Sequence, residues 1–387
     1  MRLVPLVTAV LCAALAAAAP VASAPSKPRL LLVGAAEDAA KGGGAPQADG
    51  KMALARQAGF DTIRVTSIWH PGERSIDGGE LETLQRVAAA AAANGVRVIV
   101  SVYPYGAKTT PSYATTRAQF ASYAASIPRL VPSIRHVIVG NEPNLNRFWM
   151  PQYTKAGLDA AASSYLGLLA QTYDAIKRAA PKTVVIGGSL APRGSDDPRA
   201  SRQTHSPTRF ILDLGAAYRR SGRTRPVMDW FAIHPYPERS SVPPTFAHPR
   251  STSIGLADYG KLVGLLGEAF DGTRQRGSTL PIIYDEFGVQ TMQPDDKRTL
   301  YANQDLLSAV DAVDERTQGR YYRDALRLAV CQPNVVGLLF FHVSDEADLD
   351  RWQSGVYYAD DTPKSDLPVV RAATNAARAG TLVKACR

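Results

Sequence analysis

The stretch HVIVGNEPN at residues 136–144 runs from a short apolar segment directly into Asn-Glu-Pro. A second stretch, PIIYDEFG at residues 281–288, also ends an apolar segment in a Glu. Segments that are apolar continuously, without polar alternation, are typical of strands covered on both faces, as in a parallel sheet. Each stretch therefore predicts a buried strand that delivers one carboxylate, Glu142 or Glu286, at its C-terminal end.

Short segments of this kind alternate with longer segments of helical period along the rest of the chain. Eight strands, each followed by a helix, predict an α/β fold with a single (β/α)8 TIM barrel. A doubly wound open sheet is the alternative, but GGG at residues 42–44 is too late and wrongly spaced for its phosphate-binding turn. The predicted strands are 30–33, 62–66, 96–102, 137–140, 184–187, 230–233, 282–284 and 335–341. The predicted helices are 50–58, 81–94, 112–127, 155–180, 207–221, 257–275, 300–329 and a last one near 366–383.

The N-terminus has the features of a secretory signal peptide. A charged start precedes an apolar stretch and a small-residue cleavage site that ends at Ala24. The apolar stretch is short for a membrane helix, and Leu11 is too large for a lipoprotein signal at Cys12. We expect residues 1–24 to be a signal peptide and residues 25–387 to be one catalytic domain. The protein would then be secreted or held in the cell envelope, with no stable membrane association after cleavage.

Basic residues outnumber acidic ones, with 44 Lys and Arg against 35 Asp and Glu and a formal net charge of +9. Such an excess can attract an acidic polymer or an envelope surface, or it can form a solvated surface. The arginines are scattered, which favours the solvated surface. No nucleic-acid-binding motif accompanies the charge, so we expect no nucleic-acid partner.

Two cysteines, Cys331 and Cys386, remain after removal of the predicted signal peptide. An even number of cysteines in an exported chain permits one disulfide, and we expect these two to form it. Neither has a Cys or His nearby at metal-ligand spacing, so we expect no metal site.

The two glutamates at strand ends match the requirements of glycoside hydrolysis. A retaining mechanism needs an acid that protonates the leaving oxygen and a carboxylate that attacks the anomeric carbon, about 5–5.5 Å apart. Strands four and seven of an eight-stranded barrel lie nearly opposite each other, so residues at their ends can straddle one sugar bond. We therefore expect Glu142 to be the acid/base and Glu286 the nucleophile.

Polar residues at other strand ends support this interpretation. Arg64 is a charge inside an apolar strand, so it needs a carboxylate partner at the barrel mouth. Asn141 precedes the first glutamate and could hydrogen-bond the sugar hydroxyl next to the reacting carbon. His234 and Tyr236 are two residues apart, so an extended backbone directs both toward one face, from which they can contact the glutamates. Asp285 alternates away from that face, and we expect it to be structural.

Aromatic side chains follow several of the predicted strands. Their faces could stack on sugar rings, which makes them candidates for substrate binding. These residues are Trp69, Tyr103, Tyr105, Trp149, Trp352 and Tyr357.

This ordered set resembles clan A of the glycoside hydrolases, barrels with catalytic Glu residues on strands four and seven. GNEP at 140–143 and EFG at 286–288, together with Arg64 and HPY at 234–236, resemble family 5 cellulase-type enzymes. NEPNL at 141–145, followed by FW at 148–149, is also similar to family 39. The resemblance implies a retaining mechanism, no cofactor and a β-linked oligo- or polysaccharide as substrate, and we expect a monomer.

The chain departs from this resemblance at the end of strand eight. Clan members usually have a Trp there, which forms the floor under the reacting sugar. In this chain Phe341 takes that place, and Trp352 in the following loop could fold back over the site. The departure affects which sugar is bound rather than the class of reaction.

Three other functions are alternatives to glycoside hydrolysis. A transglycosidase shares every residue named above, and the sequence does not distinguish the two. A carbohydrate-binding barrel without catalysis is disfavoured because both glutamates are present. A metal-dependent hydrolase barrel would have His-x-His after strand one, where this chain has GAAE at 34–37.

Overall fold

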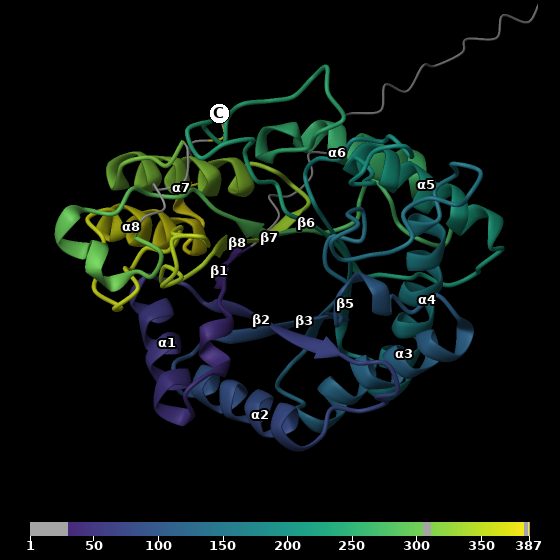
Figure 1. Cartoon of the computed structure of the whole chain (residues 1–387), viewed down its shortest axis with the longest axis horizontal. Coiled ribbons are helices and arrows are strands. Elements are labelled where there is room, and N and C mark those ends of the chain that lie inside the picture. The colour runs from purple at the N-terminus through teal and green to yellow at the C-terminus, as the bar shows by residue number, and fades with distance from the viewer. Residues whose placement is uncertain (1–29, 305–310, 383–385, 387) are drawn as a thin grey trace, which may run out of the picture.

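The structure is a computed structural model that describes residues 30–304, 311–382 and 386. The chain forms a closed barrel of eight parallel strands in sequence order, and β8 pairs with β1 to close it. Figure 1 shows the helices arranged around these strands in chain order. The predicted single (β/α)8 barrel is confirmed.

The elements of the barrel have the following bounds. The strands are β1 Leu32–Ala36, β2 Thr62–Trp69, β3 Arg97–Pro104, β4 His136–Val139, β5 Val184–Leu190, β6 Trp230–Ile233, β7 Ile282–Phe287 and β8 Val335–Phe341. The helices are α1 Ala45–Gln57, α2 Gly78–Ala93, α3 Ala114–Leu130, α4 Ala161–Ala179, α5 Pro207–Arg220, α6 Tyr259–Phe270, α7 Glu315–Val330 and α8 Leu367–Arg378. Four short 3-10 helices are η1 Asp38–Lys41, η2 Ala107–Thr109, η3 Leu256–Asp258 and η4 Asp295–Leu300.

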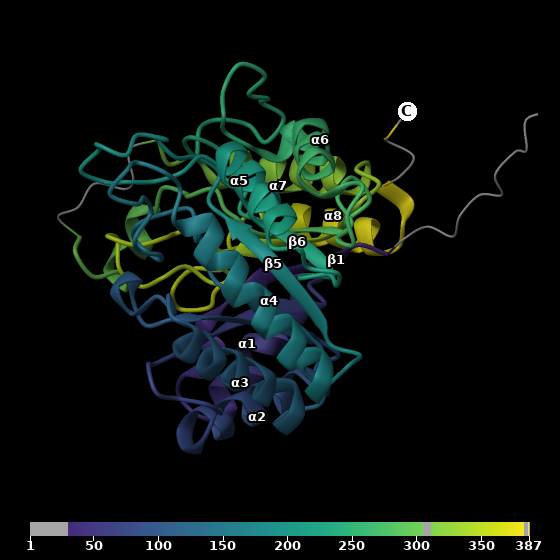
Figure 2. The same ribbon diagram turned by 90° about the vertical axis from the view of Figure 1, so that its right-hand side faces the viewer.

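Two layers of apolar side chains hold the barrel together. The larger layer packs the outer faces of the strands against the helices, and Figure 2 shows α3, α4 and α5 side by side on that outer surface. The smaller layer consists of strand residues that fill the barrel interior, as is typical of this fold. Its members are Ile99, Ile138, Ile186, Ala232, Ile283, Val336 and Leu339. Because both faces of the strands are covered, the strand sequences are apolar without alternation.

β1 differs from its predicted range of 30–33, since it continues through small residues to Ala36. Gly34 explains the difference: a Cβ atom there would lie 1.7 Å from the backbone oxygen of Thr62 on β2. A residue with no side chain is therefore required where the two strands pair closely. The longer β1 places Glu37 directly after the C-terminal end of the strand.

The helix predicted over 300–329 is shorter in the structure. α7 begins at Glu315, and Asp314 caps it by accepting a hydrogen bond from the Thr317 N–H at 2.6 Å. Leu300 instead ends the short helix η4, and residues 305–310 lie outside the described residues. α7 therefore corresponds to the second half of the predicted helix.

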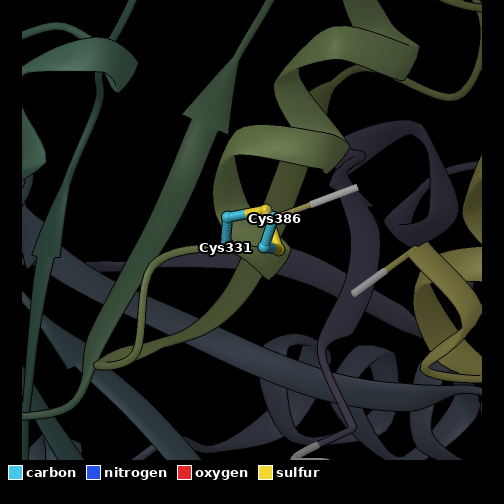
Figure 3. The surroundings of a disulfide bond; sticks show 2 residues. All are labelled: Cys331 and Cys386. Carbon is cyan, nitrogen blue, oxygen red and sulfur yellow. A yellow bond between two sulfur atoms is a disulfide. The ribbon is translucent and has the colours of Figure 1, made fainter. Parts of the chain in front are cut away.

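Cys331 and Cys386 form a disulfide bond that closes a separation of 55 residues (Figure 3). Cys331 directly follows α7, at the end of the barrel where β8 begins. The bond therefore lies away from the strand ends that carry Glu142 and Glu286. No helix within the described ranges is long and apolar enough to cross a membrane. The predicted signal peptide, residues 1–24, falls outside those ranges.

Candidate active site

A cavity of about 1110 Å³ opens at the C-terminal ends of the strands. Segments at or after all eight strands contribute to its wall, as expected for the active face of this fold. Both Glu142 and Glu286 line it. Of the other residues predicted for the site, the wall includes Arg64, Tyr103, Asn141, Tyr236, Phe341 and Trp352.

Glu142 projects from a strained turn after β4. Gly140 has a φ of +87° and Glu142 itself has a φ of +40°, in the left-handed region that a non-glycine residue seldom occupies. The Glu142 N–H donates to the Ser189 carbonyl at 2.8 Å, and its own carbonyl accepts from the Leu145 N–H at 2.9 Å. Such backbone strain costs about 1–3 kcal/mol and is characteristic of functional sites. Here it turns the Glu142 carboxylate out of the strand direction and into the cavity.

Glu286, near the end of β7, is positioned by three side chains. Its Oε1 forms an ion pair with Arg64. Its Oε2 accepts a hydrogen bond from the Tyr236 hydroxyl at 3.1 Å and lies 3.5 Å from Nδ1 of His234. The side chain retains 13% exposure, so one face of the carboxylate remains open to the cavity.

His234 joins the two glutamates. Its Nδ1 lies 3.0 Å from Oε1 of Glu142, and its Nε2 lies 3.3 Å from Oδ2 of Asp285 and 2.9 Å from Oγ of Ser189. Carboxylate oxygens accept hydrogen bonds, so a doubly protonated ring suits these contacts. Burial opposes that charge, but the carboxylates of Glu286 and Asp285 outweigh it and raise the pKa of His234 to about 10.

Arg64 organises the opposite side of the cluster from within β2. Its Nη2 donates to Oδ1 of Asn141 at 2.9 Å and to Oγ of Ser101 at 3.2 Å, and its Nε lies 3.8 Å from Asp285. Burial acts against the guanidinium charge, yet Glu286 and Asp285 hold the pKa of Arg64 above its usual value. The bond from Arg64 fixes Oδ1 of Asn141, a residue that also lines the cavity.

Aromatic rings form the wall beside Glu286. The Trp352 ring centroid is 5.1 Å from that of Tyr236 and 5.5 Å from that of Phe341. Burial and the nearby charge of Glu286 raise the pKa of Tyr236 well above its usual value, so its hydroxyl stays protonated and donates. Trp352 thus folds back from its loop onto the floor residue Phe341.

Trp69 and Trp149 do not reach the cavity, which corrects their predicted role in substrate binding. Trp69 is the last residue of β2, fully buried, and packs edge-on against Phe120 of α3. Trp149 is 1% exposed, packs against Tyr165 of α4 and donates to the Ser164 hydroxyl at 2.8 Å. Both rings belong to the packing between strands and helices.

Asp285 and Ser189 also belong to the site, and the contacts of Asp285 agree with the structural role expected for it. Asp285 is fully buried and accepts a hydrogen bond from the Ser189 hydroxyl at 2.8 Å. Burial would raise the pKa of Asp285, but the charges of His234 and Arg64 lower it below the usual value. Asp285 therefore fixes His234, which in turn contacts both glutamates, so it is a positioning residue. Asp285 has the parity of Ile283, which fills the barrel interior, and the irregular pairing of β7 with β8 between Tyr284 and Phe287 lets Glu286 face the cavity as well.

The barrel and its cavity with two glutamates define this protein as a glycoside hydrolase. The chain belongs to the cellulase family, glycosyl hydrolase family 5, whose family model matches residues 40–317. This family is one of the two that the sequence motifs resemble, and it is a member of clan A. Among curated proteins, no sequence matches this chain significantly.

Solved structures share the fold at low sequence identity. A glucosidase from Croceicoccus marinus superposes with a TM-score of 0.62 at 11% identity, covering 90% of this chain and 68% of the glucosidase. GH5_18 from Streptomyces cattleya in complex with GlcNAc gives 0.60 at 15% identity, covering 91% and 81%. A GH39 β-xylosidase from Caulobacter crescentus gives 0.54 at 18% identity, covering 91% and 72%. At these identities the similarity concerns the fold.

Proposed function

We propose that this protein hydrolyses β-linked glycans with retention of anomeric configuration, using Glu286 as nucleophile and Glu142 as acid/base. The observation that carries the proposal is the shared contact with His234. Its Nδ1 lies 3.0 Å from Glu142 and 3.5 Å from Glu286, so the two contacting oxygens are no farther apart than those distances combined. The two carboxyl groups are about 6.5–9.5 Å apart in inverting enzymes and about 5–5.5 Å apart in retaining enzymes. The upper limit set by His234 does not exceed the lower end of the inverting range, and it allows the retaining separation.

The contacts of each glutamate support its role. Glu286 makes an ion pair with Arg64 and accepts from Tyr236, which fixes a carboxylate in one orientation for attack. Glu142 contacts His234 through Oε1, and its Oε2 makes no side-chain hydrogen bond within the described part of the chain. Oε2 is therefore available to carry and transfer the proton.

The reaction would proceed in two displacements. In the first, a Glu286 oxygen bonds to the anomeric carbon as the glycosidic bond breaks, and Glu142 gives its proton to the leaving oxygen. In the second, water gives a proton to Glu142 and its oxygen attacks the anomeric carbon, which releases Glu286 as a carboxylate. Asn141, oriented by Arg64, is placed to hydrogen-bond the hydroxyl beside the reacting carbon.

Three further observations support a β-linked substrate that is longer than one sugar. Proteins that share the fold include a β-xylosidase and an exo-β-1,4-mannosidase. The cavity of about 1110 Å³ exceeds the upper size of an ordinary small-molecule pocket, about 1,000 Å³. Aromatic rings in its wall provide faces for stacking on sugars.

Secretion is part of the proposal. The signal-like residues 1–24 support it, and the disulfide between Cys331 and Cys386 suits an oxidising compartment. N-terminal sequencing of protein from the culture medium of a host that expresses the whole chain should begin at Pro25. A product that stays inside the cells with Met1 intact would contradict it.

The enzymatic proposal is tested with 4-nitrophenyl β-glucoside, β-mannoside and β-xyloside and with soluble β-linked polysaccharides. We expect hydrolysis of at least one of them, with the β-anomer as the first product seen by proton NMR. An α-anomer as the first product would overturn the retaining mechanism. A new glycosidic bond in place of the free sugar would identify a transglycosidase.

A further inference from the structure

Five arginines line the cavity, and they differ in whether the protein neutralises them. Three pair with carboxylates: Arg64 with Glu286, Arg239 with Asp311 at 3.7 Å, and Arg351 with Glu346 at 3.5 Å. The other two, Arg147 and Arg193, form no ion pair with any residue that the structure describes. Cations that line a cavity without a protein partner are candidates for contact with an anionic ligand.

Arg193, in the loop after β5, is held in place but not neutralised. Its Nη1 donates to the backbone carbonyls of Tyr236 at 3.2 Å and Pro237 at 3.1 Å. Burial lowers the pKa of Arg193 even though the charges of Glu238 and Glu142 act in the opposite direction. Glu238 lies instead 3.7 Å from the ring of His248. The Nε and Nη2 groups of Arg193 make no hydrogen bond in the described chain.

Arg147, in the loop after β4, contributes a second charge to the same side. Its guanidinium lies 5.4 Å from the centroid of the Phe148 ring, and both residues line the cavity. Phe148 in turn packs edge-on against Tyr103 at 6.2 Å. The aromatic contact orients the arginine, while its exposed guanidinium remains able to bind a ligand.

The position of the two arginines indicates which part of a substrate they would meet. They follow β4 and β5, and Glu142 follows β4. The loops after these two strands are joined directly, because the Asn144 side chain hydrogen-bonds both backbone groups of Ala191 and the Glu142 N–H donates to the Ser189 carbonyl. In the proposed reaction Glu142 protonates the leaving oxygen, so this side of the cavity holds the sugar that departs.

We propose that Arg193, assisted by Arg147, binds an acidic substituent on the leaving-group sugar, such as the carboxylate of a uronic acid. The inference rests on the proposed function, because that function defines which side receives the leaving group. A planar guanidinium offers paired N–H donors that match the two oxygens of a carboxylate. The substrate would then be an acidic β-linked glycan rather than a neutral one.

The test uses two leaving groups that differ in charge and little in shape. 4-Carboxyphenyl and 4-carbamoylphenyl β-glycosides are prepared with the sugar that the panel above identifies. The wild-type protein should prefer the carboxyphenyl substrate in kcat/KM. Arg193→Gln should reduce that preference by about 10- to 100-fold, the range for a hydrogen bond to a charged group. Using the ratio of two substrates removes any general loss of activity.

Three further variants distinguish a direct contact with the substrate carboxylate from an effect of net charge or of folding. Arg147→Gln, which breaks no described backbone hydrogen bond, should reduce the preference by a smaller factor. Arg193→Lys should restore part of it. Arg220→Gln, at the exposed end of α5, removes the same charge far from the cavity and should leave the preference unchanged.

The inference is overturned if the wild-type protein shows no preference for the carboxylate, or if Arg193→Gln lowers both substrates equally. It is also overturned if Arg220→Gln has the same effect as Arg193→Gln, because net charge would then be the cause. Each of these results leaves the proposed hydrolysis standing. Failure of the proposed function would appear earlier, as absence of turnover on the whole panel.

Discussion

Two clusters of buried charge lie beyond the C-terminal ends of the strands, and they differ in their access to the cavity. The first, called the catalytic cluster after its proposed role, consists of Arg64, Glu142, His234, Asp285 and Glu286, and both of its glutamates line the cavity. The loop cluster consists of Lys364, Asp345 and Tyr301 in the long loops after β7 and β8. Lys364 and Asp345 have fully buried side chains, and no member of this cluster lines the cavity.

The hydrogen bonds of the loop cluster show what a structural ion pair requires. Lys364 Nζ lies 2.8 Å from both Asp345 and the Thr291 hydroxyl, and Asp345 accepts from Tyr301 at 2.8 Å and from Gly355 at 2.9 Å. Each charge is thereby satisfied inside the protein. In the catalytic cluster the glutamates are 13–16% exposed and can act on a ligand. Burial of charge alone therefore does not identify a site; access to a cavity does.

The largest expected effect comes from removing Glu142, the proposed acid/base of the catalytic cluster. Glu142→Ala should slow glycosides with poor leaving groups by about 10²- to 10⁴-fold, because their oxygen must be protonated as it departs. Activated dinitrophenyl glycosides should be slowed much less in the first step, and azide should restore turnover by forming a β-glycosyl azide. Equal losses on both substrates, with no azide rescue, would assign the role to another residue.

The matching substitution in the loop cluster should affect stability instead. Asp345→Asn leaves Lys364 buried without its partner charge, which should lower the free energy of unfolding by about 3–5 kcal/mol. Chemical denaturation measures this change, and the kcat of the folded fraction should stay near that of the wild type. A large fall in kcat without loss of stability would break the distinction between the two clusters.

Much of the fold and of the candidate site was predictable because their signals are local. Continuous apolar segments that end in Glu142 and Glu286 identify the two strands, and both residues lie in one cavity. The two-residue spacing of His234 and Tyr236 correctly predicts that they approach the glutamates. Arg64 inside an apolar segment correctly predicts a carboxylate partner, which is Glu286.

The errors arise where strand length and regularity decide the direction of a side chain. β2 continues to Trp69, five residues beyond Arg64, and an odd spacing in a strand places two side chains on opposite faces. That parity was a usable signal against Trp69. β7 shows the opposite effect: Asp285 keeps the parity of Ile283 in the barrel interior, and the irregular pairing after Tyr284 lets the next residue, Glu286, face the cavity as well. Trp149 follows no periodic element, so its burial against α4 had no sequence signal.

The disulfide gives a third region that should affect stability without altering either cluster. Closing a 55-residue loop stabilises the folded state by about 4 kcal/mol in the chain-entropy model. Replacing both Cys331 and Cys386 by Ala should therefore lower the melting temperature by several degrees, as measured by calorimetry. Activity at temperatures below the transition should be unchanged. A loss of activity in the folded double variant would connect this distant region to the site.

The dependence of stability on pH tests the charge of His234 in the first cluster. The pKa of His234 is raised from 6.5 to about 10 in the folded protein, so folding favours its protonated form. Its contribution to stability is complete below pH 6.5 and is lost as the pH rises toward 10. Denaturation at several pH values should show a steeper fall for the wild type than for His234→Gln across this window. Parallel curves would show that His234 is not held protonated by its carboxylates.

The identity of the nucleophile is the central claim, and covalent trapping tests it most directly. A 2-deoxy-2-fluoro β-glycoside with a dinitrophenyl leaving group slows release of the glycosyl-enzyme, so the intermediate accumulates. Mass spectrometry of the digested protein should then locate one fluoroglycosyl group on Glu286, with no labelling of Glu286→Gln. A label on Glu142, Asp285 or any other residue, or turnover that never produces a covalent species, would contradict the account.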